Sequence, residues 1–140
     1  MTRTIKLLHP YAKIPIKKHP YDAGYDCYLI QDLVLPPYSS TKFPLGFAIQ
    51  IKPSQMLTIR SRSSTKSLGI SCTQTTCDAG YTGQLFGFLI NHTSEIVRFS
   101  IGERVVQLVF ISLASPEPII PGQLDWSDRN SSGFGSSGRF

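Results

Sequence analysis

Long hydrophobic runs are absent from this sequence. The apolar stretch at residues 85–90 is short, and Gln107 interrupts the one around Val105. Neither approaches the ~18 residues of a membrane-spanning helix. Behind Arg3 and Lys6 there is also no apolar stretch of the length that a secretory signal requires. We therefore expect an intracellular protein, cytoplasmic or nuclear, that is neither secreted nor embedded in a membrane.

Cysteine and histidine are scarce and irregularly spaced. The three cysteines are Cys27, Cys72 and Cys77. An odd number at these spacings shows neither a disulfide framework nor a CxxC metal pair, so we expect buried free thiols. The three histidines are His9, His19 and His92. They have no zinc-ligand spacing.

Charged residues make up only 16% of the chain against 41% hydrophobic residues, which is enough apolar material to bury a core. A length of 140 residues fits one domain. The formal net charge of +5 suits a polyanionic partner, but the longest basic run is Lys17-Lys18. A polyphosphate ligand fits this dispersed charge, and we do not expect nucleic acid binding.

The apolar pattern predicts an all-β fold. Phe47, Ile49 and Ile51 alternate with other residues, which is the period of a strand with one buried face. Helical periodicity does not persist for three turns anywhere, and Pro, Gly and Ser separate the runs at the spacing of a sandwich or barrel. The expected strands are residues 4–8, 25–29, 33–35, 41–51, 56–60, 84–90, 95–100 and 104–113.

The C-terminal segment differs in composition from the rest of the chain. From Asn130 it consists largely of Gly and Ser, so we expect a domain at residues 1–128 followed by a flexible arm at residues 129–140. Residues 133–138 match the GxGxxG pattern, but no helix can follow them in the remaining residues, which excludes a Rossmann site. The arm alone fits either a disordered tail or a phosphate-covering flap in which Arg129 supplies charge.

Five separated segments, in this order, resemble the motifs of the trimeric dUTPases. They are Ala23-Gly24-Tyr25-Asp26, Arg62-Ser63-Ser64, Asp78-Ala79-Gly80-Tyr81-Thr82-Gly83, Gly102-Glu103-Arg104-Val105-Val106-Gln107-Leu108, and Arg129 with residues 133–138. The resemblance covers nearly the whole chain. It implies a distorted jelly-roll β-barrel with a flexible C-terminal arm, a homotrimer with shared active sites, and hydrolysis of dUTP to dUMP and pyrophosphate.

The resemblance also implies roles for single residues. Asp78 is the expected general base that activates water, although Asp-Ala-Gly is also good turn chemistry. Tyr81 is expected to pack beneath the deoxyribose, and Phe134 to stack over uracil, which main-chain groups read. Asp26 is expected to hold Mg²⁺ through water. The expected phosphate-binding residues are Arg62, Ser63, Ser64, Gln107, Arg129, Gly135 and Ser136.

The second motif departs from the dUTPase pattern, which leaves two alternatives open. Ser61 stands where a proline is usual, and the stretch from Arg62 to Ile70 is one residue shorter than in most dUTPases, as in the related dCTP deaminases. Those deaminases carry a catalytic Glu ten residues after the aspartate, where this chain has Phe88. The other alternative is a regulatory or binding protein of the same fold without catalysis. Because the aspartate, the phosphate arginines and the arm are present, the dUTPase interpretation is favoured.

Overall fold

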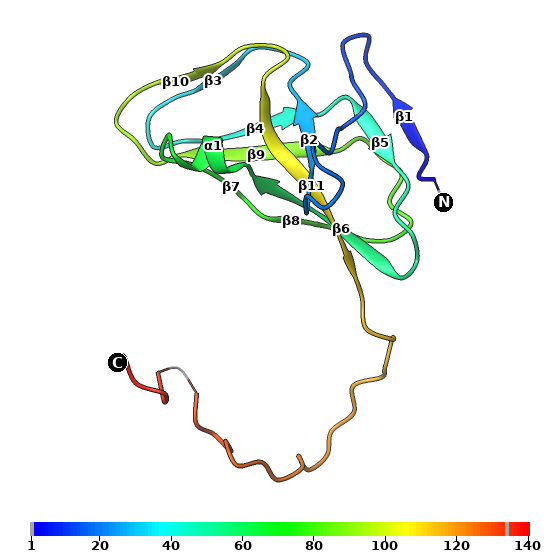
Figure 1. The fold of residues 1–140 in the computed structure, drawn as a ribbon, viewed down its shortest axis with the longest axis vertical. Helices are drawn as coiled ribbons and strands as arrows, with labels where there is room; N and C mark the ends of the chain where they lie inside the picture. Colours follow the sequence, from blue (N-terminus) through cyan, green and yellow to red (C-terminus); the bar gives the residue numbers. More distant parts are fainter. Residues whose placement is uncertain (1, 134) are drawn as a thin grey trace.

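The computed structural model describes residues 2–133 and 135–140 of the chain (Figure 1). Its elements are short strands and a single four-residue helix, so the predicted all-β class is confirmed. They are β1 (Ile5–Leu7), β2 (Tyr25–Tyr28), β3 (Leu33–Leu35), β4 (Ser40–Pro44), β5 (Phe47–Ile49), β6 (Gln55–Ser61), α1 (Ser63–Lys66), β7 (Ile70–Cys72), β8 (Thr75–Cys77), β9 (Phe86–Asn91), β10 (Val97–Phe99) and β11 (Arg104–Ser112).

All pairings between these strands are antiparallel. In the described residues, the larger sheet has the order β2-β11-β6-β8, and a smaller sheet has the order β4-β9-β7. Two further pairs, β1 with β5 and β3 with β10, complete the fold. Most neighbours are distant in sequence, as when β11 pairs with both β2 and β6. The site is therefore built by long-range pairing and not by local hairpins.

The structure corrects the strand expectation in three places. The single strand expected at residues 41–51 is broken between β4 and β5, where Gly46 adopts a φ of +80° and Ile30 leaves little room for a side chain. Both β7 and β8 lie where no strand was expected. Helix α1 is likewise new, and at four residues it is too short for periodicity to reveal.

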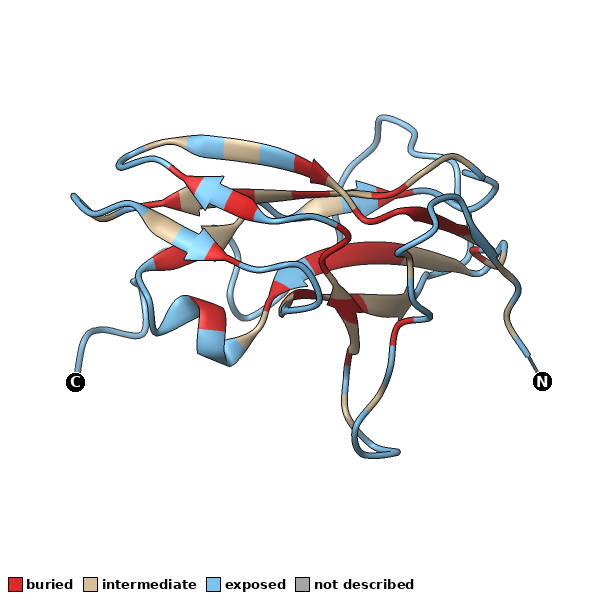
Figure 2. Ribbon diagram, turned by 90° about the horizontal axis from the view of Figure 1, so that it is seen from above, coloured by how far each residue is buried: buried red, intermediate tan, exposed pale blue. Residues whose placement is uncertain are grey.

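The core contains the apolar residues of both larger sheets, and exposed residues lie mainly in loops and at chain ends (Figure 2). The largest fully buried side chains include Phe43, Phe47 and Leu57. The thiols of Cys27 and Cys77 are free and buried as expected, whereas Cys72 is only half-buried. Burial, assisted by the nearby Asp26 charge, raises the pKa of Cys27 far above its ordinary value, so this thiol is chemically inert.

The chain leaves the barrel after β11 as an extended segment (Figure 1). Four large apolar side chains in it, Ile119, Ile120, Leu124 and Trp126, are between 77% and 101% exposed. The predicted division at Asp128 stays a prediction, because the regular elements end at Ser112. No helix among the described residues has the length and apolar character needed to cross a membrane.

We predict that Gly87→Ala destabilises the fold by about 1–3 kcal/mol, the usual cost of overpacking. Gly87 pairs with Phe43 across β9 and β4, and a Cβ there would overlap the fully buried Phe43 ring. Denaturant unfolding at fixed protein concentration measures the change. The matched control is Gly122→Ala, where a Cβ meets no atom within 4 Å. Equal stability of the two variants would contradict the packing argument.

Candidate functional site: two half-sites at opposite ends of β6

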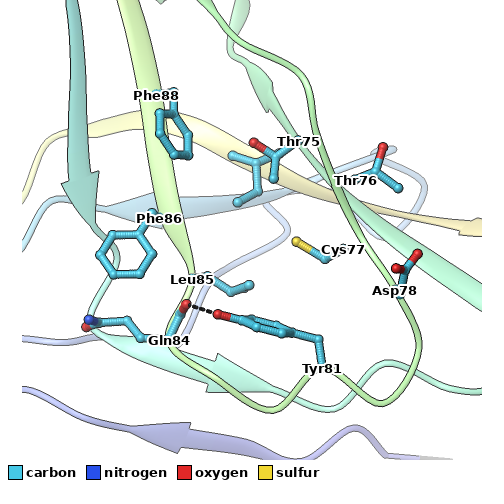
Figure 3. Close-up of a pocket in the computed structure, with 10 residues that line it drawn as sticks. Thr75, Thr76, Cys77, Asp78, Tyr81, Gln84, Leu85, Phe86 and Phe88 are labelled. Atoms are coloured by element: carbon cyan, nitrogen blue, oxygen red, sulfur yellow. Dashed lines mark hydrogen bonds between the residues drawn. The ribbon is translucent and has the colours of Figure 1, made fainter.

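The first half-site is a slot between β8 and β9. β8 pairs with β6 through one edge, and the start of β9 pairs with β4 through one edge. The Phe88 carbonyl accepts from the Thr73 amide at 2.9 Å. No strand pairing joins β8 to β9 in the part of the chain that the structure describes, so the other main-chain groups on their facing edges are open to a ligand. A cavity of about 260 Å³ lies between them (Figure 3). Its lining residues are Ile59, Thr75, Thr76, Cys77, Asp78, Tyr81, Gln84, Leu85, Phe86 and Phe88.

Asp78 and Tyr81 lie together at this slot, as the sequence predicts, on the loop after β8 (Figure 3). The Tyr81 amide donates to the Asp78 carbonyl at 3.2 Å, and Gly80 turns the loop with a φ of +86°. The Tyr81 hydroxyl donates to the carbonyl of Gln84 at 2.9 Å. A Cβ at Gly83 would come within 2.6 Å of that hydroxyl, so the glycine leaves the space that the ring occupies. The ring is thereby fixed in orientation at both ends.

Cys77 is a lining residue that the sequence did not single out as functional. Its side chain is buried against the slot, directly before the exposed Asp78. Burial, and secondarily the Asp78 charge, raises the pKa of the Cys77 thiol. The thiol therefore stays protonated and contributes an apolar surface to the slot.

The second half-site is a more polar pocket of about 420 Å³ at the other end of β6. It brings together five residues that the sequence assigned to phosphate or metal binding. Its lining residues are Lys18, Asp22, Ala23, Gly24, Asp26, Arg62, Ser63, Ser64 and Gln107. Ser63 and Ser64 are exposed on α1, which is fixed against β11 by a hydrogen bond from the buried Thr65 hydroxyl to the Val105 carbonyl at 2.8 Å.

Asp26 is held by two arginines in this pocket. Its Oδ1 accepts from Arg62 Nε at 2.8 Å, and its Oδ2 accepts from Arg104 at 3.3 Å. Arg62 also donates to the Arg104 carbonyl at 2.8 Å, which ties the two motifs together. Arg104 was missed as a site residue, although it stands inside the fourth motif. The local pattern gave no sign that its guanidinium would reach Asp26.

Gln107 is positioned by its neighbours on β11. Its Nε2 donates to the Ser61 carbonyl at 3.0 Å, and its Oε1 lies where a side chain at Gly24 would have to stand. Gly24 thus leaves the space that Gln107 fills. The amide is held at the pocket wall, as a phosphate-contacting group would need to be.

Among residues 2–133 and 135–140, no group of three or more His, Cys, Asp or Glu is arranged to hold an ion without other ligands. The pocket does offer the carboxylates of Asp22 and Asp26. One or two carboxylates completed by water and substrate phosphates are the usual setting of Mg²⁺, so this donor set fits that ion.

The two half-sites are separated within one chain, and no described residue lines both of them. Cys77, next to Asp78, pairs with Leu57 near the start of β6, whereas Arg62 follows directly after its end. Residues 57 and 62 are five positions apart, or about 16 Å along an extended strand. One chain therefore does not bring Asp78 and Arg62 into contact.

The described residues of the arm line neither half-site in this chain. Arg129 donates from Nε to the carbonyl of Ser132 at 2.7 Å, and Gly135 has a φ of +94°. Ser136 donates its amide to the Gly133 carbonyl at 2.9 Å. Phe134, predicted to stack over uracil, lies outside the described residues. The roles assigned to the arm stay predictions.

Comparison with known proteins decides the family. The sequence model described as dUTPase matches residues 10–138. This chain belongs to the dUTPase family. Its relatives include the deoxyuridine 5'-triphosphate nucleotidohydrolases of Syntrophotalea carbinolica, 34% identical over 99% of this chain and 97% of that protein, and of Picosynechococcus sp., 30% identical over 94% of each. The Staphylococcus bacteriophage 80alpha dUTPase with dUpNHpp superposes with a TM-score of 0.91 at 28% identity, over 99% of each chain. The predicted dUTPase-like fold is confirmed.

We predict that Gly24→Ala displaces Gln107 from the Ser61 carbonyl and costs about 1 kcal/mol, the usual net value of a hydrogen bond. A double-mutant cycle measured by denaturant unfolding isolates this effect. In a Gln107→Ala background the overlap is gone, so Gly24→Ala should then have little effect. An equal cost of Gly24→Ala in both backgrounds would show that Gly24 acts independently of Gln107.

Proposed function

We propose that this chain hydrolyses dUTP to dUMP and pyrophosphate, with Asp78 activating the attacking water. Membership of the dUTPase family supports the activity. The observation that carries the assignment of roles is the slot between β8 and β9, where a carboxylate and a fixed tyrosine stand beside unpaired strand edges. The second half-site, which we call the phosphate-side pocket, supplies the Arg62 guanidinium and the hydroxyls of Ser63 and Ser64.

The slot suits a nucleoside with a flat, polar base. Unpaired main-chain groups on β8 and at the start of β9 can hydrogen-bond uracil as a neighbouring strand would. The Phe86 and Phe88 rings supply apolar walls. Tyr81, with its hydroxyl bonded to the Gln84 carbonyl, would pack beneath the sugar and leave no room for a ribose 2′-hydroxyl. Rigid walls of this kind discriminate by excluding added groups.

Asp78 is suited to deprotonating a water, because its carboxylate is exposed at the mouth of the slot and not buried within it. The base would take a proton as the water oxygen attacks phosphorus. The Arg62 guanidinium and the hydroxyls of Ser63 and Ser64 would bind phosphate oxygens and stabilise the negative charge that develops there. Gln107 would add an amide donor from β11.

Mg²⁺ belongs to this proposal as a partner of the triphosphate. Asp26 would hold the ion through water, since each carboxylate oxygen keeps lone-pair capacity beside its arginine. When bound, the ion would neutralise charge on the phosphate oxygens. Arg62 and Arg104 would keep the Asp26 carboxylate oriented toward the pocket.

We further propose a homotrimer whose sites are shared between subunits. One subunit would provide Asp78 and Tyr81, a second the Arg62 pocket, and a third the arm with Arg129, Phe134, Gly135 and Ser136. The separation of the two half-sites along β6 supports this arrangement, because neither half is complete alone. The exposed apolar side chains between Ile119 and Trp126 also require cover, which further copies of the chain would provide.

The deaminase alternative is not favoured by the slot. Phe88, at the position of the deaminase glutamate, lines the cavity with an apolar ring. Asp78 is the one carboxylate among the described lining residues, so a second acid/base group for attack on a cytosine ring is missing there.

We predict that Asp78→Asn lowers the turnover of dUTP by about 10²–10⁴-fold, because a general base acts only in the transition state. Binding of a non-hydrolysable dUTP analogue should change by no more than a few-fold. Pyrophosphate release with Mg²⁺ measures turnover, and Asp125→Asn, in the exposed C-terminal segment, is the matched control.

Three outcomes would count against the proposal. Turnover of Asp78→Asn within a few-fold of the wild type would remove Asp78 from the base role. Ammonia release from dCTP would favour the deaminase alternative. Absence of any hydrolysis by the wild-type protein would favour a binding protein.

A further inference from the structure

One wall of the phosphate-side pocket comes from a segment that the five motifs do not include. Lys18, which belongs to none of the five motifs, lines this pocket together with Arg62, Ser63 and Gln107. Its side chain is exposed. Among the described lining residues, Lys18 and Arg62 are the two that carry positive charge.

The loop that carries Lys18 is anchored at its base and at its tip. At the base, Ile16 and Asp26 exchange main-chain hydrogen bonds of 3.1 Å and 2.6 Å, which closes the loop beside the pocket carboxylate. At the tip, the His19 amide donates to Asp22 Oδ2 at 2.9 Å, and the Asp22 amide donates to the His19 carbonyl at 3.1 Å. Lys18 lies between these two fixed points, so its backbone is held in place.

The neighbouring Lys17 packs against an aromatic ring. Lys17 Nζ lies over the Tyr25 ring, 4.6 Å from its centroid, and Lys17 is not part of the pocket lining. Adjacent lysines therefore have different surroundings, one packed on an aromatic ring and one at the pocket. This difference provides a matched pair for experiment.

Among the described residues, the pocket lining carries two cations, Lys18 and Arg62, and two carboxylates, Asp22 and Asp26, and Arg104 adds a third cation through its contact with Asp26. Asp26 is already paired with Arg62 and Arg104, and Asp22 accepts the His19 amide. Lys18 has no salt bridge with either carboxylate in the described structure. An ammonium in an open pocket that also holds a guanidinium and two serine hydroxyls is a site for a polyphosphate.

We propose that Lys18 is a further phosphate-binding residue, which contacts the triphosphate of the substrate from the loop that precedes the first motif. The proposal rests on the dUTPase function proposed above and deepens it. As a point charge on a flexible stem, Lys18 would add affinity for the polyphosphate and none for the nucleoside. The affinity for inorganic pyrophosphate should therefore depend on Lys18 as the affinity for dUTP does.

The test compares Lys18→Gln with Lys17→Gln and Lys18→Arg. Calorimetric titration at low salt measures Kd for a non-hydrolysable dUTP analogue with Mg²⁺, for inorganic pyrophosphate and for deoxyuridine. We expect Lys18→Gln to weaken analogue and pyrophosphate binding about fivefold to twentyfold, as for loss of one charge-assisted contact in an open pocket. Deoxyuridine affinity should not change. Lys17→Gln should stay within about twofold for all three ligands, and Lys18→Arg should restore most of the affinity.

Salt provides a second readout, because screening shortens the range of an exposed charge. The difference between Lys18→Gln and wild type should shrink as ionic strength rises. Equal Kd values for Lys18→Gln and Lys17→Gln would overturn the proposal, as would an equal loss of deoxyuridine binding. Hydrolysis of dUTP by the wild-type protein tests the proposed function separately, since pyrophosphate binding reports on Lys18 even if that hydrolysis fails.

Discussion

The pairing of β6 is the constraint on which the rest of the site depends. This strand is hydrogen-bonded to β11 over its whole length and to β8 through Leu57, Thr58 and Ile59 at its centre, so its two ends cannot approach each other. The slot lies beside the middle of β6, where Ile59 lines it, with Asp78 toward the start of the strand, and the pocket with Arg62 lies at the end of the strand. An extended strand cannot bend to join them, which is why the proposed site takes its two halves from different subunits.

Within each half-site, main-chain groups fix the functional side chains. Tyr81 is bonded to the Gln84 carbonyl, Gln107 to the Ser61 carbonyl, and Arg62 to the Arg104 carbonyl. Such contacts hold these side chains in a fixed geometry before a substrate arrives. Gly24 and Gly83 serve the same purpose by leaving the space that two of these side chains occupy.

Sequence patterns predicted the strands and site residues that depend on local spacing, and they missed the contacts that depend on how segments pair in the fold. Alternating apolar residues revealed the half-buried strands, and ordered motifs revealed the residues that gather in each pocket. The strand Thr75–Cys77 was missed because it is short and largely polar, and α1 because four residues show no period. Arg104 reaches Asp26 only through the pairing of β11 with β2, and Lys18 is brought to the pocket by the bridge between Ile16 and Asp26, and neither contact follows from a local sequence pattern.

Mixing two inactive variants tests the shared site most directly. Asp78→Asn protein keeps Arg62, and Arg62→Ala protein keeps Asp78, so each lacks one half-site. Refolded together in equal amounts, they should regain dUTP hydrolysis, because about a quarter of sites in randomly mixed trimers would combine the two intact halves. Each variant refolded alone should stay inactive. No recovery in assemblies shown by mass to contain both chains would mean that Asp78 and Arg62 act within one subunit.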